Sequence, residues 1–86
     1  MNAKHRRILR AIFSKPTLTT IRWADVESLL LALGCSKHEG KGSRVRFLFE
    51  ERRLSTHKPH GSTCDKGRID SVRDFLEAID VTPDDL

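Results

Sequence analysis

The hydrophobic period changes twice along this chain of 86 residues, and the change limits the folds that the chain can adopt. Over residues 23–33, apolar side chains recur at the three- and four-residue spacing of a helix face. Over residues 44–49 they instead alternate with other residues, as expected of a strand with one buried face. Helical spacing returns over residues 69–79. These changes predict a small α+β domain.

Three helices are expected. The first covers residues 3–13, and the second begins at Trp23 and stops at Gly34, a residue that favours helix ends. The third covers about residues 65–80, with Asp65 as its N-cap. The apolar stripes of the three helices are Ile8, Leu9, Ile12 and Phe13 in the first, Trp23, Val26, Leu30 and Leu33 in the second, and Ile69, Val72, Leu76 and Ile79 in the third, with Phe75 beside the last stripe.

Strands are expected over residues 35–57. A turn at residues 40–42, which contains two glycines, precedes the most strongly alternating strand. The charged residues 50–53 are expected to form a hairpin connection or strand edge, and residues 54–57 the returning strand. Alternation then divides the side chains between two faces. Val45, Phe47, Phe49, Leu54 and Thr56 are expected to face the core, and Arg44, Arg46, Ser55 and His57 to face outwards.

This order predicts a three-stranded antiparallel sheet with helices on one face and the other face free. Residues 1–20 are expected to form an N-terminal helical extension, residues 21–82 the α+β domain, and residues 83–86 a tail. Two roles stay open for the extension: packing on the core, or contact with a partner or a second copy. No apolar run approaches the roughly 20 residues of a membrane span, and no signal-peptide pattern is present, so a cytoplasmic protein is expected.

Positive charge is concentrated in the first part of the chain. Residues 1–60 hold 13 Lys and Arg against 5 Asp and Glu, whereas residues 61–86 hold 3 against 7. A basic body favours a polyanionic partner, most simply nucleic acid. The alternative is an ordinary solvated, charged strand edge. The basic residues expected to converge on one hairpin and to bind RNA are Arg44, Arg46, Arg52, Arg53, His57 and Lys58.

His57 and His60 are the candidates for proton transfer. Cleavage of RNA through its own 2′-hydroxyl needs a base to take that proton and an acid to protonate the leaving 5′-oxygen. Histidine is suited to both tasks because the imidazole exchanges protons near neutral pH. The alternative is that both are ordinary polar surface residues.

A structural zinc site is a second alternative. The chain contains ligand types at suggestive spacings, namely Cys35, His38, His57, His60 and Cys64. Against zinc, no CxxC pair occurs, and lysines crowd these positions. Without a secretion signal, the two cysteines are expected to be free thiols.

Several short motifs occur in a defined order along the chain. They are Leu33-Gly34 at the end of the second helix, Gly42-Ser43 at the head of the basic strand, Pro59-His60 after the last strand, Gly67 in the first turn of the last helix, and the apolar stripe that follows it. In this order and spacing, over about residues 23–81, the chain resembles the HicA toxin family of bacterial toxin–antitoxin systems.

The resemblance implies a double-stranded-RNA-binding-domain-like fold. It also implies a metal-independent endoribonuclease, an mRNA interferase that inhibits translation and needs no cofactor. Two partners follow from it, mRNA and a HicB-like antitoxin that covers the active surface. Ser43, as part of the Gly-Ser motif, joins the expected RNA-binding residues.

At one position the chain departs from the family. Members usually carry Gly-Ser-His at the strand start, and that histidine is the catalytic one, but here the position is Arg44. Arginine stays protonated, so it binds phosphate but does not act as a general base. Three outcomes remain: His57 supplies the base, His60 supplies it, or the domain binds RNA or an antitoxin without cutting. We favour His57, because alternation places it on the face of Arg44 and Arg46.

Overall fold

In the computed structural model, which describes residues 1–83, the elements follow the predicted order. The helices are α1 (Ala3–Ile12), α2 (Trp23–Ala32) and α3 (Lys66–Ala78), and the strands are β1 (Ser36–Glu39), β2 (Arg44–Phe49) and β3 (Arg52–His57). The strands form one antiparallel sheet in the order β1-β2-β3. The predicted α+β class is confirmed. Of the predicted tail, residues 84–86 lie outside the described residues.

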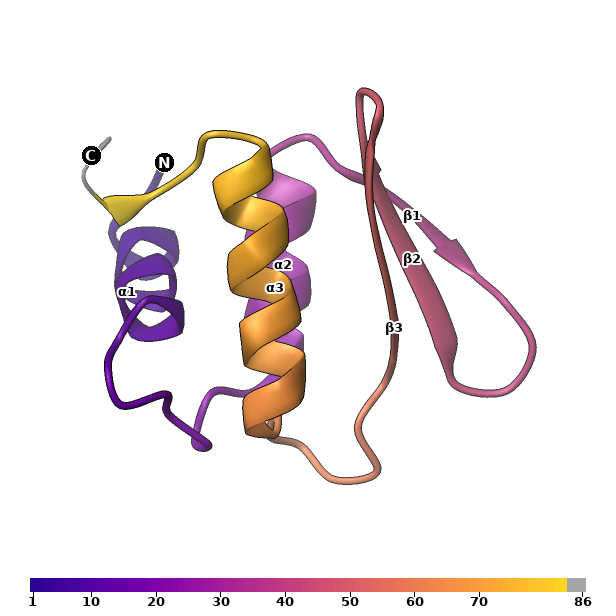
Figure 1. Cartoon of the computed structure of the whole chain (residues 1–86), viewed down its shortest axis with the longest axis horizontal. Helices are drawn as coiled ribbons and strands as arrows, with labels where there is room; N and C mark the ends of the chain where they lie inside the picture. The colour runs from indigo at the N-terminus through magenta and orange to yellow at the C-terminus, as the bar shows by residue number, and fades with distance from the viewer. Residues whose placement is uncertain (84–86) are drawn as a thin grey trace.

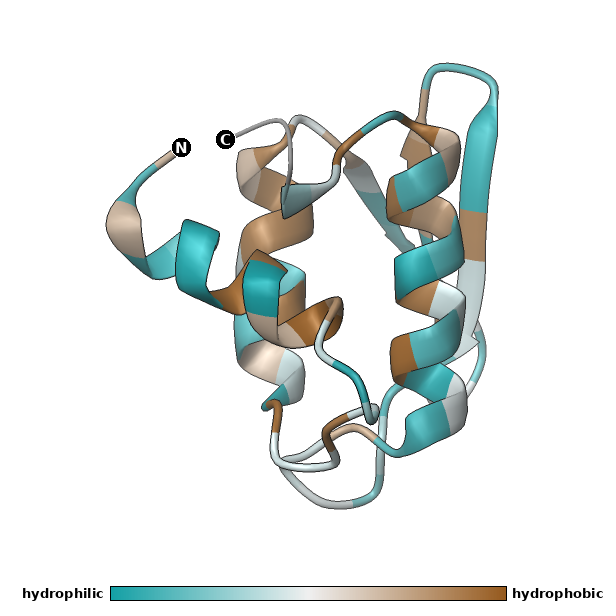
Figure 2. Cartoon of the chain, turned by 60° about the vertical axis from the view of Figure 1, so that its left-hand side comes forward, coloured by the Kyte–Doolittle hydropathy of each residue, from teal (hydrophilic) through white to brown (hydrophobic). Residues whose placement is uncertain are grey.

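The elements are stacked in three layers (Figure 1). α2 and α3 lie between the sheet on one side and α1 on the other. The middle position of α2 agrees with its composition, because hydrophobic residues occupy most of its length (Figure 2). No helix within residues 1–83 is long and apolar enough to cross a membrane. The face of the sheet that points away from the helices carries no helix from the described residues, and we call it the outer face.

One core joins all three layers. The Trp23 ring of α2 meets the Phe47 ring of β2, with ring centroids 6.1 Å apart. Ile8, Leu9 and Ile12 of α1 are buried in the same cluster, so the extension packs on the domain. The boundary at residue 20 stays a prediction. The other buried apolar side chains are Ile21, Val26, Leu29, Leu30, Cys35, Val45, Leu54, Cys64, Ile69, Val72, Phe75 and Leu76.

The predicted helix ends are confirmed at two positions. Gly34 follows α2 with φ +100°, a left-handed conformation that favours glycine. The Asp65 carboxylate accepts a hydrogen bond from the backbone N–H of Arg68 at 2.8 Å and so caps α3.

The hairpin between β2 and β3 is tighter than predicted. Only Glu50 and Glu51 form the turn, and β3 already begins at Arg52, which pairs with Phe49. Of the two alternatives predicted for residues 50–53, the hairpin connection is confirmed for Glu50 and Glu51, and the strand edge for Arg52 and Arg53. Charge suggested a loop there, but ladder pairing continues to the last pair of residues before a two-residue turn.

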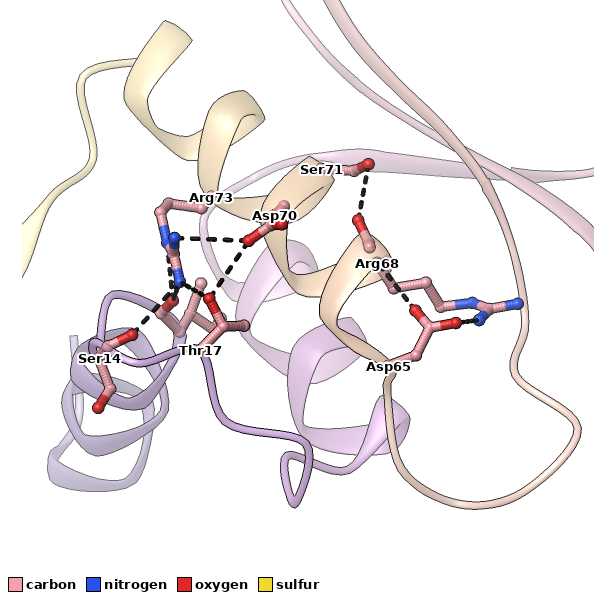
Figure 3. Close-up of polar contacts among 9 residues, drawn as sticks. Ser14, Thr17, Asp65, Arg68, Asp70, Ser71 and Arg73 are labelled. Atoms are coloured by element: carbon pink, nitrogen blue, oxygen red, sulfur yellow. Dashed lines mark hydrogen bonds and ion pairs between the residues drawn. The ribbon is translucent and has the colours of Figure 1, made fainter.

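Arg73 of α3 fastens the C-terminal end of α1 (Figure 3). Its Nε and Nη2 donate to the Ile12 carbonyl oxygen at 3.1 and 2.9 Å. Nη2 also donates to the Ser14 carbonyl at 3.4 Å and to the Thr17 hydroxyl at 3.1 Å. The last carbonyls of a helix lack partners within it and carry partial negative charge, so a guanidinium here satisfies both needs.

An ion-pair chain crosses from α2 to the end of β3. Lys37 Nζ lies 2.9 Å from Glu27 of α2 and 3.3 Å from Glu39 of β1. Glu39 in turn pairs with Lys58, directly after β3. Hydrogen bonds first to Glu27 and then to Glu39 raise the pKa of Lys37, and those from Lys58 and then Lys37 lower the pKa of Glu39. These ion pairs connect β1 to α2 on one side and to the segment after β3 on the other.

We expect Arg73→Met to lower the free energy of unfolding by about 1–3 kcal/mol, because it leaves half-buried carbonyls without a donor while keeping most of the aliphatic stem. Glu77→Gln, on the exposed side of the same helix, is the matched control. Denaturant unfolding of the variants measures the difference. Equal stability of the two variants would contradict the role given to Arg73.

We expect Glu39→Gln to lower the melting temperature at neutral pH and the deficit to shrink in acid. The folded-state pKa of Glu39 is lowered from its usual 4.5, so its contribution is present above that value and is lost as the pH falls through the lowered pKa. Melting curves between about pH 7 and pH 3 test this, with Glu50→Gln in the exposed turn as control. A deficit that grows towards acid would be inconsistent with the ion-pair chain.

Candidate nucleic-acid interface

Cross-strand pairing brings the predicted outward side chains together. Arg44 of β2 lies directly opposite His57 of β3, and Arg46 lies opposite Ser55. Directly paired residues of an antiparallel ladder point to the same side, and the intervening Val45 is buried on the helix side. The predicted register is therefore confirmed, and all four side chains lie on the outer face.

Strand β1 adds a histidine to the outer face, which the sequence did not predict. His38 of β1 pairs with Arg46 from the other side, so it also lies on the outer face. From the sequence alone, His38 is a candidate zinc ligand only. Residues 36–39 contain no apolar residue, so the sequence does not show which of their side chains face the core. The pairing of β1 with β2, across the turn at residues 40–42, determines the face on which His38 lies.

These residues line a depression of about 440 Å³ on the outer face. That size lies within the roughly 300–1,000 Å³ of small-ligand sites. Its chemistry is cationic: among the described residues, the Arg44 and Arg46 guanidinium groups are exposed and have no ion-pair partner, and the nearby carboxylate of Glu39 is engaged by lysines. The residues that line it include His38, Glu39, Lys41, Arg44, Arg46, Ser55 and His57.

Two of the predicted RNA-binding arginines lie apart from the depression and from each other. Arg53 pairs with Leu48 and is on the outer face, but four residues along β3 from His57, which is about 13 Å. Arg52 pairs with Phe49 and therefore points to the helix side, so the prediction that it joins Arg44 is corrected. A strand in place of the expected loop separates these adjacent residues onto opposite faces.

The predicted residues next to the strands have other surroundings. The Lys58 ammonium is held by Glu39, and the Lys58 backbone N–H donates to the Ser43 carbonyl at 2.8 Å. Ser43 is exposed in the turn that leads into β2. His60 is exposed in the loop between β3 and α3, and it does not line the depression. That loop runs towards α2, where Ser62 accepts from the Trp23 N–H at 2.9 Å.

Arg68 of α3 ties this loop to the end of β3. Its Nε donates to the His57 carbonyl oxygen at 2.6 Å. Its Nη1 pairs with Asp65 at 2.9 Å, as Figure 3 shows. The backbone that carries His57 is therefore fastened to a core helix rather than left at a free strand end.

The ligand types weighed for zinc do not converge. Among residues 1–83, no group of three or more His, Cys, Asp or Glu side chains is arranged to hold a metal ion. Cys35 and Cys64 are both buried free thiols, as the sequence predicted for their redox state. Burial raises the pKa of both thiols, with the Arg68 charge partly offsetting the effect at Cys64. Both therefore behave as packing residues.

Comparison with protein families identifies the domain. The family described as HicA toxin of bacterial toxin–antitoxin matches residues 23–81, a span that runs from the start of α2 to just beyond α3 and covers more than half of the chain. No curated protein and no solved structure matches. The resemblance seen in the motifs is confirmed over the same residues, with α1 outside the match. The chain belongs to the HicA family, the toxins of bacterial toxin–antitoxin systems.

Proposed function

We propose that the outer face binds mRNA and that the protein cleaves it as an endoribonuclease in the cytoplasm. The observation that carries the proposal is the direct pairing of Arg44 with His57 on an exposed cationic surface. A fixed cation and an imidazole side by side supply two of the groups that phosphodiester cleavage through the 2′-hydroxyl needs: one group holds the phosphate and the other takes the 2′-hydroxyl proton.

The reaction follows from these two chemistries. Arg44 and Arg46 bind the non-bridging phosphate oxygens and stabilise the charge that builds there in the transition state. His57 accepts the proton of the 2′-hydroxyl while the 2′-oxygen forms its bond to phosphorus. The bond from phosphorus to the 5′-oxygen breaks and that oxygen takes up a proton from an acid, giving a 2′,3′-cyclic phosphate and a 5′-hydroxyl. Phosphate binding and proton transfer are both within the chemistry of protein side chains, so the proposed reaction uses no metal or other cofactor.

The proposal accounts for the departure at the head of β2. By the resemblance, Arg44 stands where the family carries its histidine, and His57 is the residue directly across the ladder from Arg44. In this proposal the proton-transfer group lies on β3 instead of β2, but on the same face of the sheet. We propose that a HicB-like antitoxin covers this face, so that antitoxin and RNA compete for it.

We expect His57→Ala to slow RNA cleavage by about 10²–10⁴-fold, the usual contribution of a general base. Cleavage by the wild type is expected to continue in EDTA, and mass spectrometry of the fragments is expected to show 2′,3′-cyclic phosphate ends. RNA with 2′-O-methyl groups, which lacks the nucleophile, is expected to stay intact.

His60→Ala is the matched control, because His60 is an exposed histidine outside the depression. Undiminished cleavage by His57→Ala would refute the assignment, and loss through His60→Ala instead would move the base to the loop. Binding without cleavage by the wild type would leave a non-catalytic RNA-binding module.

We expect the double variant Arg44→Ala/Arg46→Ala to reduce the salt dependence of RNA binding. Each lost phosphate contact on a single strand lowers the slope of log K against log salt by about 0.7, so a reduction of about 1.4 is expected. Arg6→Ala/Arg10→Ala, which removes two exposed arginines of α1, is the charge-matched control. An equal reduction in both double variants would indicate binding by net charge alone.

A further inference from the structure

The proposed cleavage needs a second proton-transfer group. The leaving 5′-oxygen is a poor leaving group unless an acid protonates it as its bond to phosphorus breaks. An in-line displacement puts the attacking and leaving oxygens on opposite sides of the phosphorus, so one imidazole on one side serves only one of them well. Guanidinium groups are too weakly acidic for this task.

The position of His38 meets this need. It lies on β1, one edge of the sheet, whereas His57 lies on β3, the other edge. Between them the central strand presents Arg44 and Arg46. From the strand spacing and rise, the Cα atoms of the two histidines are about 12 Å apart, with both exposed side chains on the outer face. A phosphodiester seated on the two arginines therefore lies between the two rings.

The immediate surroundings of His38 leave it free to act. Its Nε2 lies 3.3 Å from the Ser36 hydroxyl oxygen, a hydrogen bond that holds the ring from one side and leaves Nδ1 available. The neighbouring carboxylate of Glu39 does not compete, because it is engaged by Lys37 and Lys58. Of the two other histidines, His5 bonds to the Ser28 hydroxyl on the helical side, and His60 lies outside the depression.

We propose that His38 is the general acid of the reaction, paired with His57 as the base; this inference rests on the proposed function. The His38 imidazolium donates its proton to the 5′-oxygen as the P–O5′ bond breaks, while His57 takes the 2′-hydroxyl proton. The turnover leaves His38 neutral and His57 protonated, and proton exchange with solvent restores both.

A substrate with sulfur in place of the bridging 5′-oxygen tests this assignment. A thiolate leaves without protonation, because thiols are much stronger acids than alcohols, so such a substrate no longer needs the acid. We expect the His38→Ala variant to cleave ordinary RNA about 10²-fold or more slowly than the wild type. We expect it to cleave the 5′-thio RNA at close to the wild-type rate. His57→Ala is expected to be slow on both substrates.

The outcomes separate the inference from the function on which it rests. Failure of the wild type to cut ordinary RNA would refute the proposed function. Cleavage that depends on His57 but not on His38 would overturn only this inference. A His38→Ala variant that is equally slow on both substrates would also overturn it, because that pattern indicates a binding or structural role for His38. His60→Ala controls for the loss of an exposed imidazole. Melting curves test whether His38→Ala keeps the fold, and binding of uncleavable 2′-O-methyl RNA tests whether it keeps the RNA-binding surface.

Discussion

The pairing of β2 between two other strands is the constraint on which the rest of the structure depends. Val45 and Phe47 are buried against the helices, so the pleat sends Arg44 and Arg46 to the other side. A slip of one residue would exchange these sets and bury two guanidinium groups without partners, at a cost of several kcal/mol for each. Burial of two apolar side chains thus determines which side chains form the outer face.

The helices support that face from behind. Two arginines of α3 hold neighbouring elements: Arg73, in the middle of the helix, donates to the last carbonyl of α1, and Arg68, in its first turn, donates to the carbonyl of His57. One core helix therefore joins the segment outside the family match to the strand that carries the proposed base. This arrangement explains how a domain of this size holds an additional helix without a second core.

Sequence periodicity predicted the parts of the fold that bury apolar residues. The helical stripes, the stop at Gly34 and the alternation of β2 were all predictable, because each follows from a hydrophobic pattern or a backbone preference. The outward position of His57 followed from the same alternation, once a register was assumed.

Positions without an apolar pattern were not predictable. The strand β1 consists of Ser, Lys, His and Glu, so the face of His38 is set only by its pairing with β2. Arg52 was misplaced because a run of charged residues resembles a loop, although the ladder continues through it. The ion pair that occupies Lys58 joins residues 19 positions apart, a contact that no local pattern encodes.

The central claim is that the outer face of the sheet is the RNA-binding surface, and chemical-shift mapping tests it most directly. Titration of the isotope-labelled protein with an uncleavable 2′-O-methyl RNA reports every backbone and arginine side-chain signal at once. The account predicts that the largest changes fall on Arg44, Arg46, His57 and His38. Changes centred on the exposed arginines of α1, with those four signals unmoved, would contradict it.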